Sequence, residues 1–132
     1  MRFRARQRIR SSKDFTKIRT EGSRVTSGSF FLQGVIRTLE NSGSAWEQSR
    51  LGVVASKRVG NAIVRARAKR LMREIYRKHA MKLAHPVDLV MVARPHLLKK
   101  AMIESENEFC QACRSLGVMR LGDDLEEKVA LQ

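Results

Sequence analysis

The sequence predicts an α/β (α+β) two-layer sandwich, in which one mixed sheet of about four strands packs against helices in the order α-β-β-β-α-β-α. Two observations support this fold class. Apolar residues recur with helical spacing in several segments, and β-forming residues dominate the stretches between them. The chain has 132 residues, of which 42% are hydrophobic, so it is long enough for one domain with a modest core.

A short helix and a strand-rich region are expected in the first half of the chain. The helix spans residues 11 or 12 to 21, because a serine can cap its N-terminus and Gly22 can end it. Strands are expected at 29–38 and 50–56, where β-forming residues dominate. The polar segment 39–49 between these strands is expected to be a hairpin loop.

A long helix, a buried strand and a last helix are expected in the second half. The long helix spans residues 61 to about 84. Its core-facing stripe consists of apolar residues at positions i, i+4, i+7 and i+11: Val64, Ala68, Leu71 and Ile75. The segment 87–93 is apolar at both parities, as in a central strand buried on two faces. The last helix spans about 98 to 116.

Positive charge is the strongest compositional signal. The chain has 27 basic and 13 acidic residues, a net charge of +14, and without the acidic tail 117–132 the charge of the remaining body is +16. Such a field indicates a polyanionic partner, nucleic acid before an anionic membrane surface. Residues 1–116 are therefore expected to form one nucleic-acid-binding domain, and the tail 117–132 is expected to be disordered. No apolar segment has the length of a membrane span or follows the N-terminus as in a secretory signal, so a cytoplasmic location is expected.

The basic residues concentrate in two segments, 1–24 and 57–82, which hold 19 of the 27. On the long helix they lie opposite the apolar stripe. A helical projection gives Ala66, Lys69, Arg70, Arg73 and Arg77 on this face, with Arg65 and Arg67 at its flanks. Adjacent like charges repel one another, and bound phosphates would neutralise them. The alternative interpretation is a solvated basic face without a ligand.

Residues for autonomous catalysis or metal binding are not evident in the sequence. Cys110 and Cys113 form a single C-x-x-C without the second ligand pair that a zinc site needs, and the spacing also suits packing within a helix. The chain has no carboxylate cluster, His pair or Gly-rich phosphate loop. We therefore expect no catalytic and no metal-binding residues in this chain.

The segment 57–74 resembles the signature of the bacterial ribonuclease P protein family, which has a basic pair, Gly-Asn-Ala, and then Arg-Asn-Arg-x-Lys-Arg-x-x-Arg. The matching residues are Lys57-Arg58, Gly60-Asn61-Ala62 and Arg65-Ala66-Arg67-Ala68-Lys69-Arg70-Leu71-Met72-Arg73. The segments 8–15 and 87–95 resemble the opening and the last strand of the family's domain. The resemblance covers residues 8–116.

The resemblance implies that the chain is the accessory protein subunit of a ribonucleoprotein endoribonuclease. Such a subunit binds the catalytic RNA and the 5′ leader of precursor tRNA, and it supports maturation of the tRNA 5′ end. Catalysis and the Mg²⁺ that it uses belong to the RNA, and no obligate protein partner is expected. Salt should weaken RNA binding steeply, because many phosphates are neutralised.

The resemblance also implies two sets of site residues. The RNA-binding set is Lys57, Arg58, Arg65, Arg67, Lys69, Arg70 and Arg73. Phe15, Phe31, Gln33 and Arg19 would line the leader cleft, where bases stack on rings without sequence preference, although Phe15 and Phe31 could instead be core residues. The chain departs from the family at Ala66, where Asn is usual, and at Arg19 and Gln33, where an aromatic residue is frequent.

Three other interpretations remain open at this stage. A ribosomal or ribosome-assembly protein would need the same charge, and its fold could be the same. A metal-dependent nuclease would cleave RNA without an RNA subunit. A DNA-binding helix is a further alternative, although nothing indicates dimer symmetry.

Overall fold

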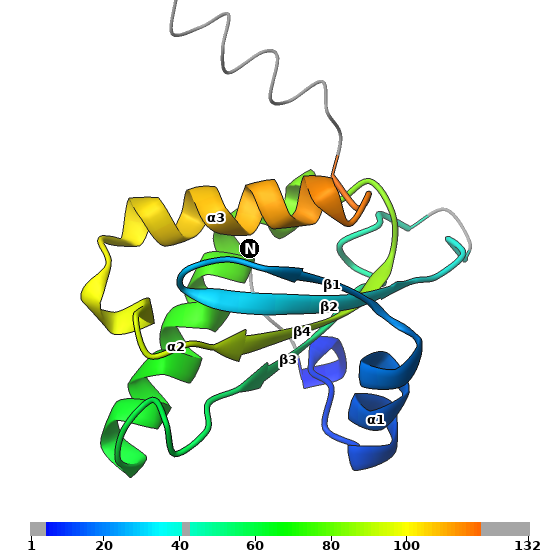
Figure 1. Cartoon of the computed structure of the whole chain (residues 1–132). Helices are drawn as coiled ribbons and strands as arrows, with labels where there is room; N and C mark the ends of the chain where they lie inside the picture. Colours follow the sequence, from blue (N-terminus) through cyan, green and yellow to red (C-terminus); the bar gives the residue numbers. More distant parts are fainter. Residues whose placement is uncertain (1–4, 41–42, 120–132) are drawn as a thin grey trace, which may run out of the picture.

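The computed structural model describes residues 5–40 and 43–119. Its helices and strands are α1 (Ser12–Glu21), β1 (Ser23–Thr26), β2 (Phe30–Ile36), β3 (Arg50–Val54), α2 (Ala62–His79), β4 (Val87–Ala93) and α3 (Met102–Ser115). Short 3-10 helices lie at η1 (Ala5–Gln7), η2 (Ala80–Lys82) and η3 (Leu97–Lys99). The four strands form one sheet in the order β1-β2-β4-β3, with α2 and α3 packed on one face and α1 on part of the other (Figure 1). This is the predicted α+β fold.

The order of the elements agrees with the prediction, although sequence patterns located two of the three strands that precede α2. The strand they missed is β1, whose four residues Ser-Arg-Val-Thr are mostly exposed. A polar edge strand of this kind has no buried alternation to reveal it.

The segment 39–49 is not a hairpin loop, and the prediction was wrong here. β2 and β3 are not neighbours, because β4 lies between them, antiparallel to β2 and parallel to β3. β4 takes the central place because its residues are apolar at both parities and six of the seven are buried. The hairpin instead joins β1 to β2, where the amide of Ser27 donates to the carbonyl of Phe30 at 2.9 Å.

Helices α1 and α2 begin at polar caps. The hydroxyl of Ser11 accepts from the amide of Lys13, and the Oδ1 atom of Asn61 accepts from the amide of Val64 at 3.0 Å. The ends differ from prediction. α2 stops at His79 and the chain tightens into η2, so the expected extension to residue 84 was wrong, and α3 begins at Met102, after η3, instead of near residue 98.

The core-facing stripe of α2 is rotated from its predicted position. Ala68 and Ile75 are buried as expected, but Val64 and Leu71 are half-buried, and Met72 and Tyr76 are fully buried in their place. The rotation follows from packing on two partners, since α2 contacts the sheet and also α3, where the Tyr76 ring meets Phe109 edge-on.

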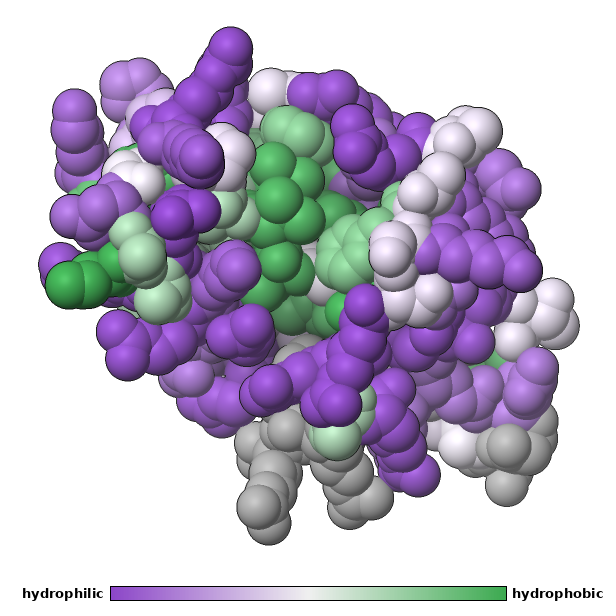
Figure 2. Space-filling model, turned by 90° about the horizontal axis from the view of Figure 1, so that it is seen from below, coloured by the Kyte–Doolittle hydropathy of each residue, from purple (hydrophilic) through white to green (hydrophobic). Residues whose placement is uncertain are grey.

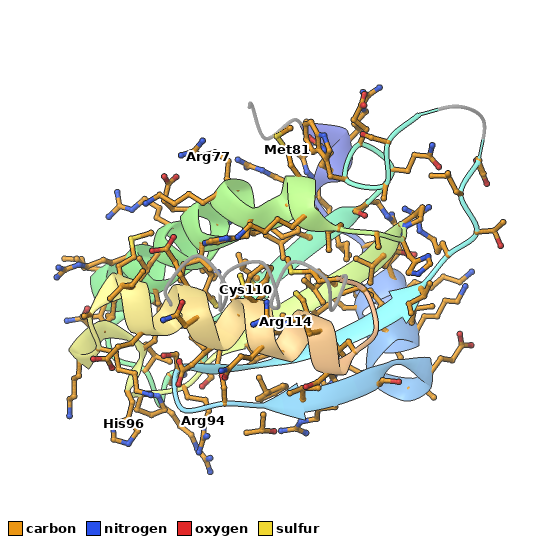
Figure 3. The ribbon with its side chains drawn as sticks, turned by 90° about the horizontal axis from the view of Figure 1, so that it is seen from above. Arg77, Met81, Arg94, His96, Cys110 and Arg114 are labelled. Carbon is orange, nitrogen blue, oxygen red and sulfur yellow. The ribbon has the colours of Figure 1, made fainter. Side chains whose placement is uncertain are left out.

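Both cysteines are free and buried on α3, and Figure 3 shows Cys110 within this helix above the sheet. Burial, with a smaller effect of Cys110, raises the pKa of the Cys113 thiol far above its ordinary value. That thiol therefore stays protonated at neutral pH and packs as a small apolar group.

The packed body continues past residue 116. Val118 and Met119 are buried, and Met119 forms an isolated β-bridge with Leu83. Residues 120–132, on which most of the predicted disordered tail falls, lie outside the described residues. None of the described helices is long and apolar enough to span a membrane.

Candidate nucleic-acid interface

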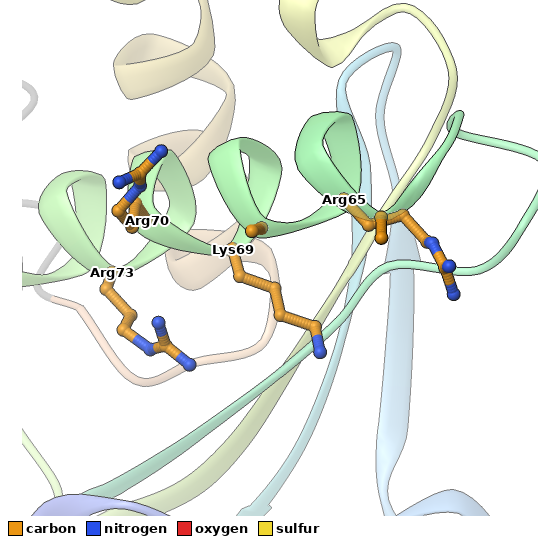
Figure 4. Close-up of a pocket in the computed structure, with 6 residues that line it drawn as sticks. Arg65, Lys69, Arg70 and Arg73 are labelled. Atoms are coloured by element: carbon orange, nitrogen blue, oxygen red, sulfur yellow. The ribbon is translucent and has the colours of Figure 1, made fainter.

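A row of long cationic side chains lies on the exposed side of α2. Arg65, Lys69 and Arg73 follow one another at intervals of four residues, so they extend from the same side of the helix, while Arg70 extends from the other (Figure 4). Between them is an open hollow of about 410 Å³. The residues that line this hollow define the α2 basic face: Ala62, Arg65, Ala66, Lys69, Arg70 and Arg73.

Within residues 5–40 and 43–119, no carboxylate compensates the charge of the α2 basic face. Among the described residues, none forms an ion pair with Arg65, Lys69, Arg70 or Arg73. The Nε atom of Arg65 is buried without a hydrogen-bond partner in the described part of the chain. Burial, and next the charge of Arg8, lower the pKa of Arg73 from its ordinary value. The cations of the α2 basic face therefore lie close to other positive charges, and a bound anion would stabilise their charged forms.

The remaining cations predicted to bind RNA are distributed around this face. Arg67 lies on the far flank of α2, where it and Arg70 border a second hollow of about 490 Å³ that reaches Lys100. Lys57 and Arg58 belong to the turn before α2, and Arg58 borders a hollow on the sheet side. Arg77, assigned to the same helix face by projection, instead pairs with Glu74.

The second candidate surface is the part of the sheet that α1 leaves open. Strand pairing aligns Phe31 with Val92 and Val92 with Val54, so these three side chains lie in one row on the face opposite α2 and α3. All three are half-buried. From below, Figure 2 shows an apolar area bordered by hydrophilic residues. We call Phe31, Val54 and Val92, together with Arg24 beside them, the open sheet face.

An ion-pair network sets the position of α1 on the sheet. Arg50 on β3 donates from Nε and Nη2 to the carboxylate of Asp88, at 3.0 and 2.8 Å, and from Nη1 to Asp14 on α1, at 3.2 Å. Arg37 also pairs with Asp88, at 3.2 Å. The hydrogen bonds with Asp88, more than those with Asp14, raise the pKa of the Arg50 guanidinium. α1 is thereby held at one end of the sheet and leaves the other end uncovered.

The four residues predicted to line a leader cleft have different environments. Phe15 is half-buried and lies over Gly52, where an added Cβ would come within 2.6 Å of the ring. Phe31 is half-buried on the open sheet face, with the guanidinium of Arg24 3.8 Å from its ring centroid. Gln33 is buried at 8% exposure, and Arg19 is exposed on α1. The structure therefore brings Phe15 and Phe31 to one face of the sheet, whereas Gln33 is mostly covered.

Sequence patterns did not identify two cations at these surfaces, Arg24 and Arg94. Arg24 pairs with Gln33 across β1 and β2 and so shares a face with Phe31, two residues along. Arg94 follows β4 and donates to the carbonyl of Ser27 at 2.6 Å. Figure 3 shows Arg94 on the opposite side of the molecule from Arg77. If β1 were recognised as a strand, the alternation of its side chains would predict the face on which Arg24 lies. The position of Arg94 depends on the order of the strands in the sheet, which no local pattern gives.

The surfaces described here do not fit a protein-bound Mg²⁺ ion, which prefers carboxylate and other oxygen ligands. The α2 basic face presents guanidinium and ammonium groups, which repel a divalent cation. Within residues 5–40 and 43–119, no three His, Cys, Asp or Glu side chains gather where they could hold a metal ion.

A small α+β domain with a cationic helix on one side and an open, partly aromatic sheet on the other has the features of a nucleic-acid-binding protein. The family model described as Ribonuclease P matches residues 3–117. The chain belongs to this family, whose members are protein subunits of a ribonucleoprotein endoribonuclease. Membership implies ribonuclease P RNA as the partner.

Curated relatives extend over nearly the same length. The ribonuclease P protein component of Syntrophobacter fumaroxidans is 32% identical over 108 residues, which cover 81% of this chain and 85% of the relative. That of Alkaliphilus metalliredigens is 29% identical over 109 residues, covering 83% and 92%.

Solved structures share the fold. The Staphylococcus aureus RNase P protein superposes with a TM-score of 0.68 at 24% identity, covering 86% of this chain and 98% of that chain. The Thermotoga maritima RNase P protein superposes with a TM-score of 0.65 at 23% identity, covering 79% and 92%.

Proposed function

We propose that the chain binds the catalytic RNA of ribonuclease P through the α2 basic face and the single-stranded 5′ leader of precursor tRNA through the open sheet face. In this role it supports endonucleolytic maturation of the tRNA 5′ end, in the cytoplasm. The observation that carries the proposal is the row Arg65, Lys69 and Arg73, whose cations pair with no carboxylate of the described chain. Phosphates of a folded RNA supply the missing negative charge.

The open sheet face supports the second half of the proposal. Unpaired bases present flat apolar surfaces, and Phe31 with its valine neighbours offers a half-buried apolar row of matching character. Arg24 lies beside this row and adds positive charge that attracts the negatively charged leader. Phe15, from α1, lies over Gly52 on the same face of the sheet.

The division of labour between protein and RNA follows from charge. We assign catalysis and Mg²⁺ to the RNA, because its phosphates attract the metal ions that the α2 basic face repels. The protein contributes by binding the leader and by screening phosphate repulsion where substrate and catalytic RNA meet.

The decisive experiment is multiple-turnover cleavage of a precursor tRNA at low Mg²⁺ concentration with a bacterial ribonuclease P RNA, with and without this protein. We expect cleavage at the mature 5′ end to need both components. Absence of stimulation would contradict the proposal and favour a ribosomal role. Cleavage by the protein alone would place the active site in this chain.

A further inference from the structure

A stacked pair of side chains lies at the end of the open sheet face nearest the turn before α2. The guanidinium of Arg24 lies over the ring of Phe31, with its central carbon 3.8 Å from the ring centroid. Strand register explains this contact, because Arg24 is paired with Gln33 and Thr26 with Phe31, which makes Arg24 and Phe31 diagonal neighbours on one face. Arg24 is exposed, so the outer side of its planar guanidinium is accessible.

Two further arginines border the same hollow, which has a volume of about 340 Å³. Arg58 comes from the turn before α2, and Arg94 follows β4. The Nη1 atom of Arg94 donates to the carbonyl of Ser27, which holds this side chain across the β1–β2 turn. In the described part of the chain, no carboxylate pairs with Arg24, Arg58 or Arg94.

The hollow matches the chemistry of a nucleotide. A nucleotide has a flat base and a phosphate, and the hollow has a flat cation supported by a ring together with two arginines suited to phosphate. Its volume is at the lower end of the range for ligand sites, about 300–1,000 Å³, which suits a single unit. A bound base would extend the stack of Phe31 and Arg24 by one layer.

We propose that this hollow binds one nucleotide of single-stranded RNA, with the base stacked on Arg24 and the phosphate held by Arg58 and Arg94. The proposal rests on the proposed function, in which the leader is the single-stranded RNA. Phe31 belongs to the sheet and Arg58 to the turn that enters α2. At this nucleotide the leader therefore passes from the open sheet face toward the α2 basic face.

Four variants separate stacking from charge. Arg24→Lys keeps the charge and removes the flat surface, and Arg24→Gln removes both. Phe31→Leu keeps an apolar side chain and removes the ring beneath Arg24. Lys78→Gln is the matched control for loss of one exposed cation, since Lys78 lies in the last turn of α2 outside the hollow. Circular dichroism melting confirms that each variant folds.

The first measurement is the affinity of the assembled enzyme for precursor tRNA with a leader, divided by its affinity for mature tRNA. This leader preference should fall about five- to a hundredfold in Arg24→Gln, Arg24→Lys and Phe31→Leu, as expected for loss of one base-stacking contact. It should stay at the wild-type value in Lys78→Gln. A wild-type preference in Arg24→Lys would overturn the stacking proposal.

The second measurement uses the full-length protein and a short single-stranded RNA with 2-aminopurine at successive positions. Stacking should quench the fluorescence at one position in the wild type and not in Arg24→Lys. Equal quenching in the two proteins would also overturn the proposal. If the wild-type enzyme shows no leader preference at all, the proposed leader function fails, and this experiment still decides whether the hollow binds a base.

Discussion

The α2 basic face belongs to the helix that packs on one face of the sheet, and the open sheet face lies on the other, where Arg58 from the turn before α2 borders its hollow. They differ in chemistry. The helix presents flexible cations in a row and no aromatic side chain, whereas the sheet presents a half-buried apolar row with one arginine stacked on a ring.

The difference follows from the two secondary structures. A helix returns to the same side every fourth residue, with about 6 Å of rise, so it arranges long side chains along one line at the surface. A strand alternates its side chains between faces, so one face of a sheet becomes a flat array of closely spaced neighbours. The first arrangement suits a charged backbone and the second suits flat bases, and the two surfaces should therefore respond differently to salt and to substitution.

The largest expected effect comes from removing the charge of the α2 basic face. The triple substitution Arg65→Ala, Lys69→Ala and Arg73→Ala should weaken binding of ribonuclease P RNA about a hundredfold at physiological salt and lower the salt slope by about 2 to 3, because three phosphate contacts are lost. Filter binding across a salt series measures both quantities. Lys78→Ala is the single-cation control, and an unchanged slope in the triple variant would contradict the assignment.

A smaller effect is expected from Asp88→Asn, which removes a negative charge from β4 in the sheet. Loss of its charge leaves Arg50 and Arg37 without their shared partner. The free energy of unfolding should fall by about 2 kcal/mol, less than for a fully buried pair because these arginines are 31% and 38% exposed. Urea denaturation measures the change. Leader preference should fall because α1 is held less firmly on the sheet, while the affinity for ribonuclease P RNA stays constant. A loss of RNA affinity with unchanged leader preference would show that the two surfaces are not independent.

A third prediction concerns Glu108, which links α3 to the β1–β2 turn on the face of the sheet that α2 and α3 cover. Its Oε1 atom accepts from Lys100 at 2.7 Å and from the amide of Gly28 at 3.2 Å. Burial alone would raise the pKa of this carboxyl, but the hydrogen bonds from Lys100, Ser29 and Gly28 and the charge of Lys100 together lower it below the ordinary value of 4.5.

Because the folded-state pKa of Glu108 is lowered, its stabilising contribution is complete above pH 4.5 and is lost as the pH falls through the folded-state pKa. Glu108→Gln should therefore be less stable than the wild type at neutral pH, and the difference should shrink in acid. Thermal melts from pH 7 to about pH 3 measure this convergence. A constant difference across the series would show that the charge of Glu108 contributes nothing.

The smallest effect is expected from Ala66→Asn. Ala66 is exposed between the cations of the α2 basic face, so the substitution should be tolerated at a cost of about 0.5 kcal/mol in helix propensity. One added neutral hydrogen bond to RNA is worth about 1 kcal/mol, so affinity should rise by no more than a few fold. A folding defect in this variant would mean that position 66 is not accessible.

Local patterns in the sequence were sufficient for the first helix with its serine cap, the start of the long helix near Asn61, the doubly buried strand 87–93 and the exposed position of Ala66. These features depend on residues within a few positions of one another, through helical period, strand parity and capping chemistry. The basic face of the long helix belongs to the same group, because the 3.6-residue period alone separates it from the apolar stripe.

Strand order, the place of the hairpin and the neighbours of each strand residue were decided by the tertiary structure. Insertion of β4 between β2 and β3 depends on competition among distant segments for the most buried position. Packing of α2 against both the sheet and α3 rotates its apolar stripe toward Met72, and the tertiary structure also buries Gln33. It also brings Arg24, Phe31, Arg58 and Arg94 to one hollow, since these residues come from four separate parts of the chain and no local period relates them.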